Sequence, residues 1–281
     1  MGWLYLTLLS VVITAFANIL QRVLMKDDKS NPYSYAIAFH LVVTVFYFAF
    51  SSINGFSLPA FSIKFLFMPL ASMLWGLGTV FLFRALKLLE ISEVTIIGST
   101  RTLVTIVGSV LFLGDTFGFQ KIVGTAIMFL SVFLATNLKN GIKFNKGITY
   151  SFGMAICYGL GLVFDAFNIK SFDPISYLAI GNLMISLFLL LLFPQTVKAW
   201  KEYVNPPFLK KMLPLGILSS TQAVAYYFAI KYGPTSQIAS INLSLIIVTV
   251  LLAAILLKER DNLFKKIIAA LLVTLGIFLL R

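Results

Sequence analysis

Long apolar stretches separated by short polar gaps dominate the chain. Most stretches run for about 20 residues, the length that an α-helix needs to cross a bilayer core of about 30 Å. The pattern predicts an all-α integral membrane protein with ten transmembrane helices. The expected spans are 3–25, 33–54, 65–86, 94–113, 119–137, 148–168, 174–193, 212–230, 235–257 and 263–280.

Within several predicted spans, polar residues recur every three or four positions and therefore share one face of a helix. Such a stripe either joins neighbouring helices or faces a water-accessible cavity. Several stripes in one bundle favour a cavity. The stripes are Ser10, Thr14, Asn18 and Gln21 in span 1; His40, Thr44 and Tyr47 in span 2; Gly98, Arg101, Thr105 and Gly108 in span 4; Tyr158, Gly161, Asp165 and Asn168 in span 6; and Ser219, Gln222 and Tyr226 in span 8.

The second half of the chain repeats the first. Asn31-Pro32 before span 2 matches Asp173-Pro174 before span 7, and further pairs follow at a nearly constant displacement, such as Lys87 with Lys231 and Thr105 with Thr249. We therefore expect two five-helix repeats, 1–140 and 147–281. Because five is odd, the two halves enter the membrane from opposite faces. Inverted repeats of this kind recur in transporters, with a substrate site between the halves.

Acidic residues close spans 4 and 9, in Leu113-Gly114-Asp115 and Leu257-Lys258-Glu259. With these marks, the chain resembles a ten-helix, EamA-like member of the drug/metabolite transporter superfamily over essentially its whole length. Family copies more usually read Gly-Glu, whereas this chain has Gly-Asp and Lys-Glu. The resemblance implies movement of small metabolites without covalent chemistry, a multi-pass protein of a prokaryotic inner (cell) membrane, and a central cavity lined by spans 1, 3, 4, 6, 8 and 9.

Composition agrees with a membrane protein, since 59% of residues are hydrophobic, 11% are charged and the mean hydropathy is +0.97. The net charge of +12 forms no basic stripe, so we expect no nucleic-acid partner. Sixteen Lys and Arg residues lie after odd-numbered spans and five lie on the other side, which predicts both termini outside. The resemblance implies both termini inside, so orientation stays open. A single cysteine, Cys157, offers neither a disulfide nor a zinc site.

Three ionisable residues inside spans are the sharpest candidates for function. Arg101, about 10 Å into its span, either reaches back to the interface, binds an acidic group of a substrate or neutralises Asp165. Asp165 either faces the cavity, reaches the interface or pairs locally with Lys170. His40 is the only histidine, and we expect a structural role for it, with proton coupling as the alternative. Glu90 and Glu93 are expected in a solvated ion-pair cluster with Lys87 and Arg84.

The leading hypothesis is a secondary active transporter that moves a zwitterionic or amine-containing, amino-acid-like metabolite by alternating access. Alternatives are a transporter or channel for another solute class, such as a nucleotide, vitamin or quaternary amine, and a membrane-embedded enzyme. The chain lacks paired catalytic groups and a phosphate-binding loop, so we expect neither an enzyme nor a bound cofactor. The expected partners are lipid, a small-molecule substrate and a coupling ion or proton, with the protein a monomer or weak homodimer. The candidate cavity residues are Asn18, Gln21, Trp75, Arg101, Tyr158, Asp165, Gln222, Tyr226 and Asn242, with Asp165 and His40 for proton coupling.

Overall fold

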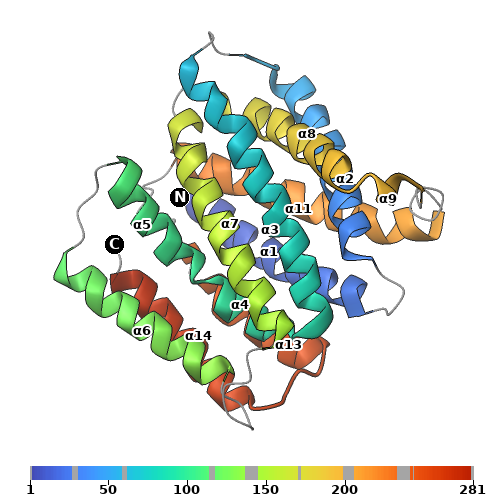
Figure 1. Ribbon diagram of the computed structural model, residues 1–281. Coiled ribbons are helices and arrows are strands. Elements are labelled where there is room, and N and C mark those ends of the chain that lie inside the picture. Colours follow the sequence, from blue (N-terminus) through green and yellow to red (C-terminus); the bar gives the residue numbers. More distant parts are fainter. Residues whose placement is uncertain are drawn as a thin grey trace.

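The computed structural model describes residues 2–26, 31–58, 62–113, 118–136, 145–169, 172–198, 206–232, 241–242 and 244–279, which form a helical bundle (Figure 1). The first half contains α1 (Gly2–Lys26), α2 (Pro32–Asn54), η1 (Ile63–Leu66), α3 (Phe67–Leu88), α4 (Ile91–Gly98), α5 (Arg101–Leu113) and α6 (Phe119–Thr136). The second half contains α7 (Lys146–Ile169), α8 (Pro174–Leu192), α9 (Gln195–Lys198), α11 (Pro206–Tyr232), α13 (Ser244–Leu256) and α14 (Leu263–Leu279).

The helices follow the predicted spans to within a few residues at most ends. Among the described residues, α1, α2, α3, α7 and α8 are each long and apolar enough to cross a membrane. The short helix α9 was not predicted, and α11 begins six residues before the expected span. Residues 233–240, with which predicted span 9 begins, lie outside the described residues. The prediction of an all-α integral membrane protein is confirmed.

The prediction of one continuous helix over 94–113 is wrong, because the chain turns at Ser99 and Thr100 between α4 and α5. The hydroxyls of these two residues donate to the carbonyl oxygens of Ile96 and Ile97, at 2.6 and 2.7 Å. The backbone N–H groups of Thr100 and Leu103 bond three residues back instead of four. Side-chain bonds of this kind compete with the helical ladder. The break places Arg101 at the first position of α5.

The two halves begin their second helices with the same device. The Asn31 side chain accepts hydrogen bonds from the backbone N–H groups of Tyr33 and Ser34, and Asp173 accepts one from Ser176 at 2.8 Å. A proline follows each cap at the first helical position, where its missing N–H costs nothing. The Pro turns that revealed the repeat are therefore equivalent helix caps.

Packing between the halves is reciprocal. Helix α3 packs against α7 and α8, and its counterpart α11 packs against α1 and α2; likewise α5 packs against α7, and α13 against α1. The equivalent pairs α2 with α8 and α6 with α14 pack against each other, and Figure 1 shows α6 and α14 side by side at one edge. An exchange of the halves thus reproduces the same contacts. With the five spans that the sequence predicts for each half, such a relation is that of inverted repeats.

Candidate functional site

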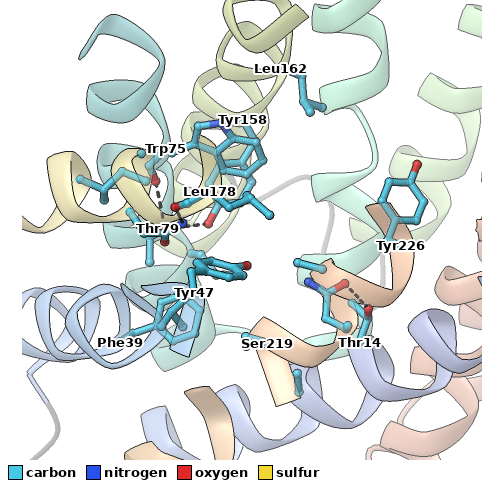
Figure 2. A pocket seen from close by; sticks show the side chains of 18 of the residues that line it. Thr14, Phe39, Tyr47, Trp75, Thr79, Tyr158, Leu162, Leu178, Ser219 and Tyr226 are labelled. Atoms are coloured by element: carbon cyan, nitrogen blue, oxygen red, sulfur yellow. Dashed lines mark hydrogen bonds between the residues drawn. The ribbon is translucent and has the colours of Figure 1, made fainter. Parts of the chain in front are cut away.

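A pocket of about 430 Å³ lies between the two halves of the bundle. All nine predicted cavity residues line it, although His40 does not. The lining also includes residues of α2 and α8, which the resemblance did not imply. Its volume lies in the range of small-molecule sites. Figure 2 shows Trp75, Thr79 and Tyr158 grouped on one side of the pocket, and Thr14, Ser219 and Tyr226 on the other.

Asp165 of α7 is held by two neutral donors. The indole Nε1 of Trp75 donates to one carboxylate oxygen at 2.8 Å, and the hydroxyl of Tyr177 donates to the other at 2.5 Å. The Asp165 side chain is buried and lines the pocket. Lys170, its predicted local partner, lies outside the described residues. Sequence reasoning missed Tyr177, although the residue belongs to the repeated segment before span 7.

Arg101 also faces the pocket, from the start of α5. Tyr158 and Tyr226 lie close enough to interact electrostatically with its guanidinium. Among the described residues no carboxylate forms an ion pair with Arg101, so the predicted neutralisation by Asp165 is not seen. Gly159 brings α7 close to this site, since a Cβ there would lie 2.7 Å from the Arg101 carbonyl oxygen.

The wall formed by α1 and α11 is built from small hydroxyls and amides. The Thr14 hydroxyl lies 2.9 Å from Oε1 of Gln222, and the Ser10 hydroxyl donates to the Gln222 backbone carbonyl at 3.0 Å. Asn18 reaches Thr249 of α13 at 3.5 Å. The sequence left two alternatives for the polar stripe of span 1, contact with neighbouring helices or exposure to a cavity. In the structure the stripe does both.

His40 lies directly behind the pocket wall and is 4% exposed. Its Nδ1 is 2.9 Å from Oδ1 of Asn182, and its Nε2 is 2.9 Å from the hydroxyl of Thr79. The Thr79 hydroxyl lies 3.0 Å from that of Tyr158, which faces the pocket. The imidazole is thus fully hydrogen-bonded, as a structural histidine should be, and it contacts the pocket through Thr79 and Asn182.

Charged side chains from the two halves pair at the end of the bundle where α1 and α3 finish. Glu259 accepts hydrogen bonds from the backbone N–H groups of Ile91 and Ser92 at the start of α4, and it lies 3.6 Å from Arg22. Lys266, 1% exposed, pairs with Glu90. The expected solvated cluster around Glu90 is therefore wrong, because its cationic partner comes from α14 and is buried. Asp115, the counterpart of Glu259, lies outside the described residues.

Comparisons with known proteins agree with this architecture. The family model of the EamA-like transporter family matches residues 1–137 and again residues 145–281. A crystal structure whose description names no function aligns with a TM-score of 0.67 at 14% sequence identity, covering 98% of this chain and 96% of that chain. At this identity the similarity concerns the fold alone. No curated protein sequence matches the chain.

Proposed function

Because the chain belongs to the EamA-like transporter family, whose members are multi-pass membrane transporters, we propose that it carries a small zwitterionic metabolite of the amino-acid type. The proposed binding site is the pocket between the halves. Its volume of about 430 Å³ suits a solute of that size and leaves room for water.

One observation carries the choice of a zwitterion. The pocket contains a cation, Arg101, and an anion, Asp165, that do not pair with each other among the described residues. Asp165 satisfies its oxygens with Trp75 and Tyr177 instead. A guanidinium suits a carboxylate through two parallel hydrogen bonds, whereas a carboxylate beside aromatic rings suits an ammonium group. A solute with both a carboxylate and an ammonium group could pair with both Arg101 and Asp165.

Transport would proceed by alternating access between the inverted repeats. The reciprocal packing of α3 with α7 and of α11 with α1 gives two equivalent seams along which the halves could rock around the pocket. Ion pairs of Arg22 with Glu259 and of Lys266 with Glu90 join the two halves at one end, and we expect them to break when that end opens. A gradient would supply the driving force, with Asp165 the carboxylate in the pocket wall available to carry a coupling proton.

A ligand-binding screen tests the proposed solute class. The purified protein is heated with each standard amino acid and, in parallel, with choline, adenine and thiamine, and the shift in its thermal midpoint is measured. Each amino acid that binds is compared with its des-amino acid and its decarboxylated amine; for leucine these are 4-methylpentanoate and 3-methylbutylamine. We expect the zwitterion to give the largest shift, since only it uses both charges.

Two variants test which residue binds which charged group of the solute. Arg101→Ala should weaken binding of the amino acid and of the des-amino acid and leave the amine unchanged. Asp165→Asn should weaken binding of the amino acid and of the amine. Lys210→Ala, at an exposed position of α11, is the matched control and should leave all three unchanged. Binding of choline, adenine or thiamine without any amino acid, or amino-acid binding that survives both pocket substitutions, would overturn the proposal.

A further inference from the structure

The tautomer of His40 follows from its neighbours. Nδ2 of Asn182 lies 2.9 Å from the backbone carbonyl oxygen of Leu178, which can only accept a hydrogen bond. The amide nitrogen of Asn182 must therefore face Leu178, and its carbonyl oxygen must face His40. Since that oxygen is also an acceptor, Nδ1 of His40 carries the proton that joins them. The orientation of one amide thus fixes which ring nitrogen is protonated.

His40 is neutral in this environment. Its ring is 4% exposed, and its polar contacts among the described residues are the amide of Asn182 and the hydroxyl of Thr79. A buried imidazolium without an anionic partner would be costly. With Nδ1 protonated, Nε2 is left as an acceptor.

The acceptor at Nε2 sets the direction of the next two bonds. The Thr79 hydroxyl has one proton and two acceptors at 2.9 Å, Nε2 of His40 and the backbone carbonyl oxygen of Trp75. We assign the proton to Nε2, because two lone pairs facing each other there would repel, whereas the Trp75 carbonyl lies inside α3 and can accept from the helix backbone. The contact between Thr79 and Tyr158 at 3.0 Å then needs its proton from Tyr158. All bonds therefore run one way, from Tyr158 through Thr79 and His40 to Asn182.

The direction of these hydrogen bonds determines whether the pocket wall presents donors or acceptors to a ligand. Because the Tyr158 proton is engaged with Thr79, the phenol oxygen turns only lone pairs toward the pocket. The protons of Trp75 Nε1 and of the Tyr177 hydroxyl are engaged with Asp165 in the same way. The wall formed by Tyr158, Tyr177 and Asp165 therefore accepts hydrogen bonds, which suits an ammonium group with three N–H donors.

We propose that His40, which does not line the pocket, is a positioning residue for an amine subsite: it holds the Tyr158 hydroxyl as a donor to Thr79, so that the phenol oxygen accepts from the ligand. This inference rests on the proposed function for its ligand class. The direction of the hydrogen bonds, however, can be measured without any ligand.

Nitrogen NMR of the histidine-labelled protein tests the direction. The chain has a single histidine, so one imidazole gives the whole signal. We expect a neutral ring with Nδ1 protonated and Nε2 unprotonated. Thr79→Val should shift the Nε2 resonance, while Thr44→Val, which removes a buried hydroxyl bonded to the His40 backbone carbonyl, should leave it in place. A ring protonated at Nε2, or at both nitrogens, would overturn the inference.

Binding measurements test the consequence for the amine. Thr79→Val releases the Tyr158 proton and should weaken binding of an amino acid identified in the screen by about three- to tenfold, as for a neutral hydrogen bond. Binding of its des-amino acid should stay unchanged. In a Tyr158→Phe background Thr79→Val should add nothing, because the phenol oxygen is gone.

The outcomes separate the two proposals. An equal loss for the amino acid and its des-amino acid, or a loss that adds fully to that of Tyr158→Phe, indicates a structural role for Thr79 and His40 and contradicts the inference. If no amino acid binds the wild-type protein, the proposed function fails, and the NMR result still decides the direction of the hydrogen bonds.

Discussion

At the scale of single residues, the carboxylate of Asp165 depends on donors that sequence spacing does not reveal. Tyr177 is twelve positions away and Trp75 is ninety positions away, and each supplies one proton to a different oxygen. The two bonds hold the carboxylate against the wall of the pocket. Removal of one donor should therefore both destabilise the protein and loosen the proposed amine subsite.

Tyr177→Phe tests this support directly. It removes one hydroxyl from a buried carboxylate, so we expect a loss of about 1–3 kcal/mol, seen as a lower thermal midpoint in detergent. Tyr47→Phe is the matched control, since Tyr47 is also buried and lines the same pocket, yet its hydroxyl makes no hydrogen bond within the described part of the chain. Equal midpoints for the two variants would show that the Tyr177 bond does not support Asp165.

The sequence predicted which residues gather at the pocket better than it predicted their partners. Stripes at helical spacing identified the pocket-facing side of α1, α7 and α11 because a polar residue in lipid must turn inward. Their partners, such as Thr79 and Asn182 for His40, come from helices far away in the chain and depend on tertiary packing. Spacing also gave no sign that the Arg101 and Asp165 side chains would share the pocket without pairing.

At the scale of helices, glycine permits the close approach of α5 and α7 that positions Arg101. A Cβ on Gly159 would lie 2.6 Å from Cβ of Val104 and 2.7 Å from the Arg101 carbonyl oxygen, where backbone cannot yield locally. Gly159→Ala should therefore cost about 1–3 kcal/mol and weaken carboxylate binding. Gly181→Ala is the control for stability alone, because its Cβ would meet only Cε of Met68 at 3.8 Å but Gly181 itself lines the pocket.

The two glycine variants are compared by thermal midpoint, and Gly159→Ala is compared with the wild-type protein by binding of a des-amino acid such as 4-methylpentanoate. A Gly159→Ala protein as stable as Gly181→Ala, with unchanged carboxylate binding, would mean that the α5–α7 crossing does not set the place of Arg101.

Helix α4 depends on a cap supplied from the other half of the chain. Glu259 accepts from the first backbone N–H groups of α4 and from the Ser92 hydroxyl at 3.1 Å, while it faces Arg22. Glu259→Ala would remove the acceptor of the Ile91 and Ser92 N–H groups, although Glu93 still accepts from the Glu90 N–H, and it would leave the Arg22 guanidinium without its anion. We therefore expect a loss of about 2–4 kcal/mol. Asp261→Ala, at an exposed position two residues on, should change the thermal midpoint little. Comparable losses in both variants would contradict the capping role.

The same scale shows where helix prediction failed. Hydropathy counts apolar residues and therefore read 94–113 as one span, whereas the hydroxyls of Ser99 and Thr100 redirect the backbone by bonding to Ile96 and Ile97. A Ser-Thr pair inside an apolar run was a visible signal. In the sequence, the repeat displacement of 144 residues pairs Ser99 and Thr100 with Leu243 and Ser244, next to Asn242 of the pocket lining.

At the scale of the whole molecule, the two repeats could be predicted because similar helix caps and other matching residues recur in both halves at a nearly constant sequence separation. The packing follows the same repeat, since α3 contacts α7 just as its counterpart α11 contacts α1. The sequence gives two different orientations in the membrane. The count of basic residues uses the loops alone and favours both termini outside, whereas the family resemblance favours both inside. The ion pairs of Arg22 with Glu259 and of Lys266 with Glu90 lie on the side with the larger number of basic residues.

Alternating access requires that the pocket become reachable from each face of the membrane in turn. The most direct measurement uses Ala223→Cys, which places a thiol in the pocket lining of α11, in a protein whose native Cys157 is replaced by serine. Membrane-impermeant maleimide is added to right-side-out vesicles and, separately, to inside-out vesicles. We predict labelling from both faces, slower from the face where the ion pairs of Glu259 and Lys266 join the two halves. Labelling from one face only, or from neither, would contradict a pocket that opens alternately to both sides.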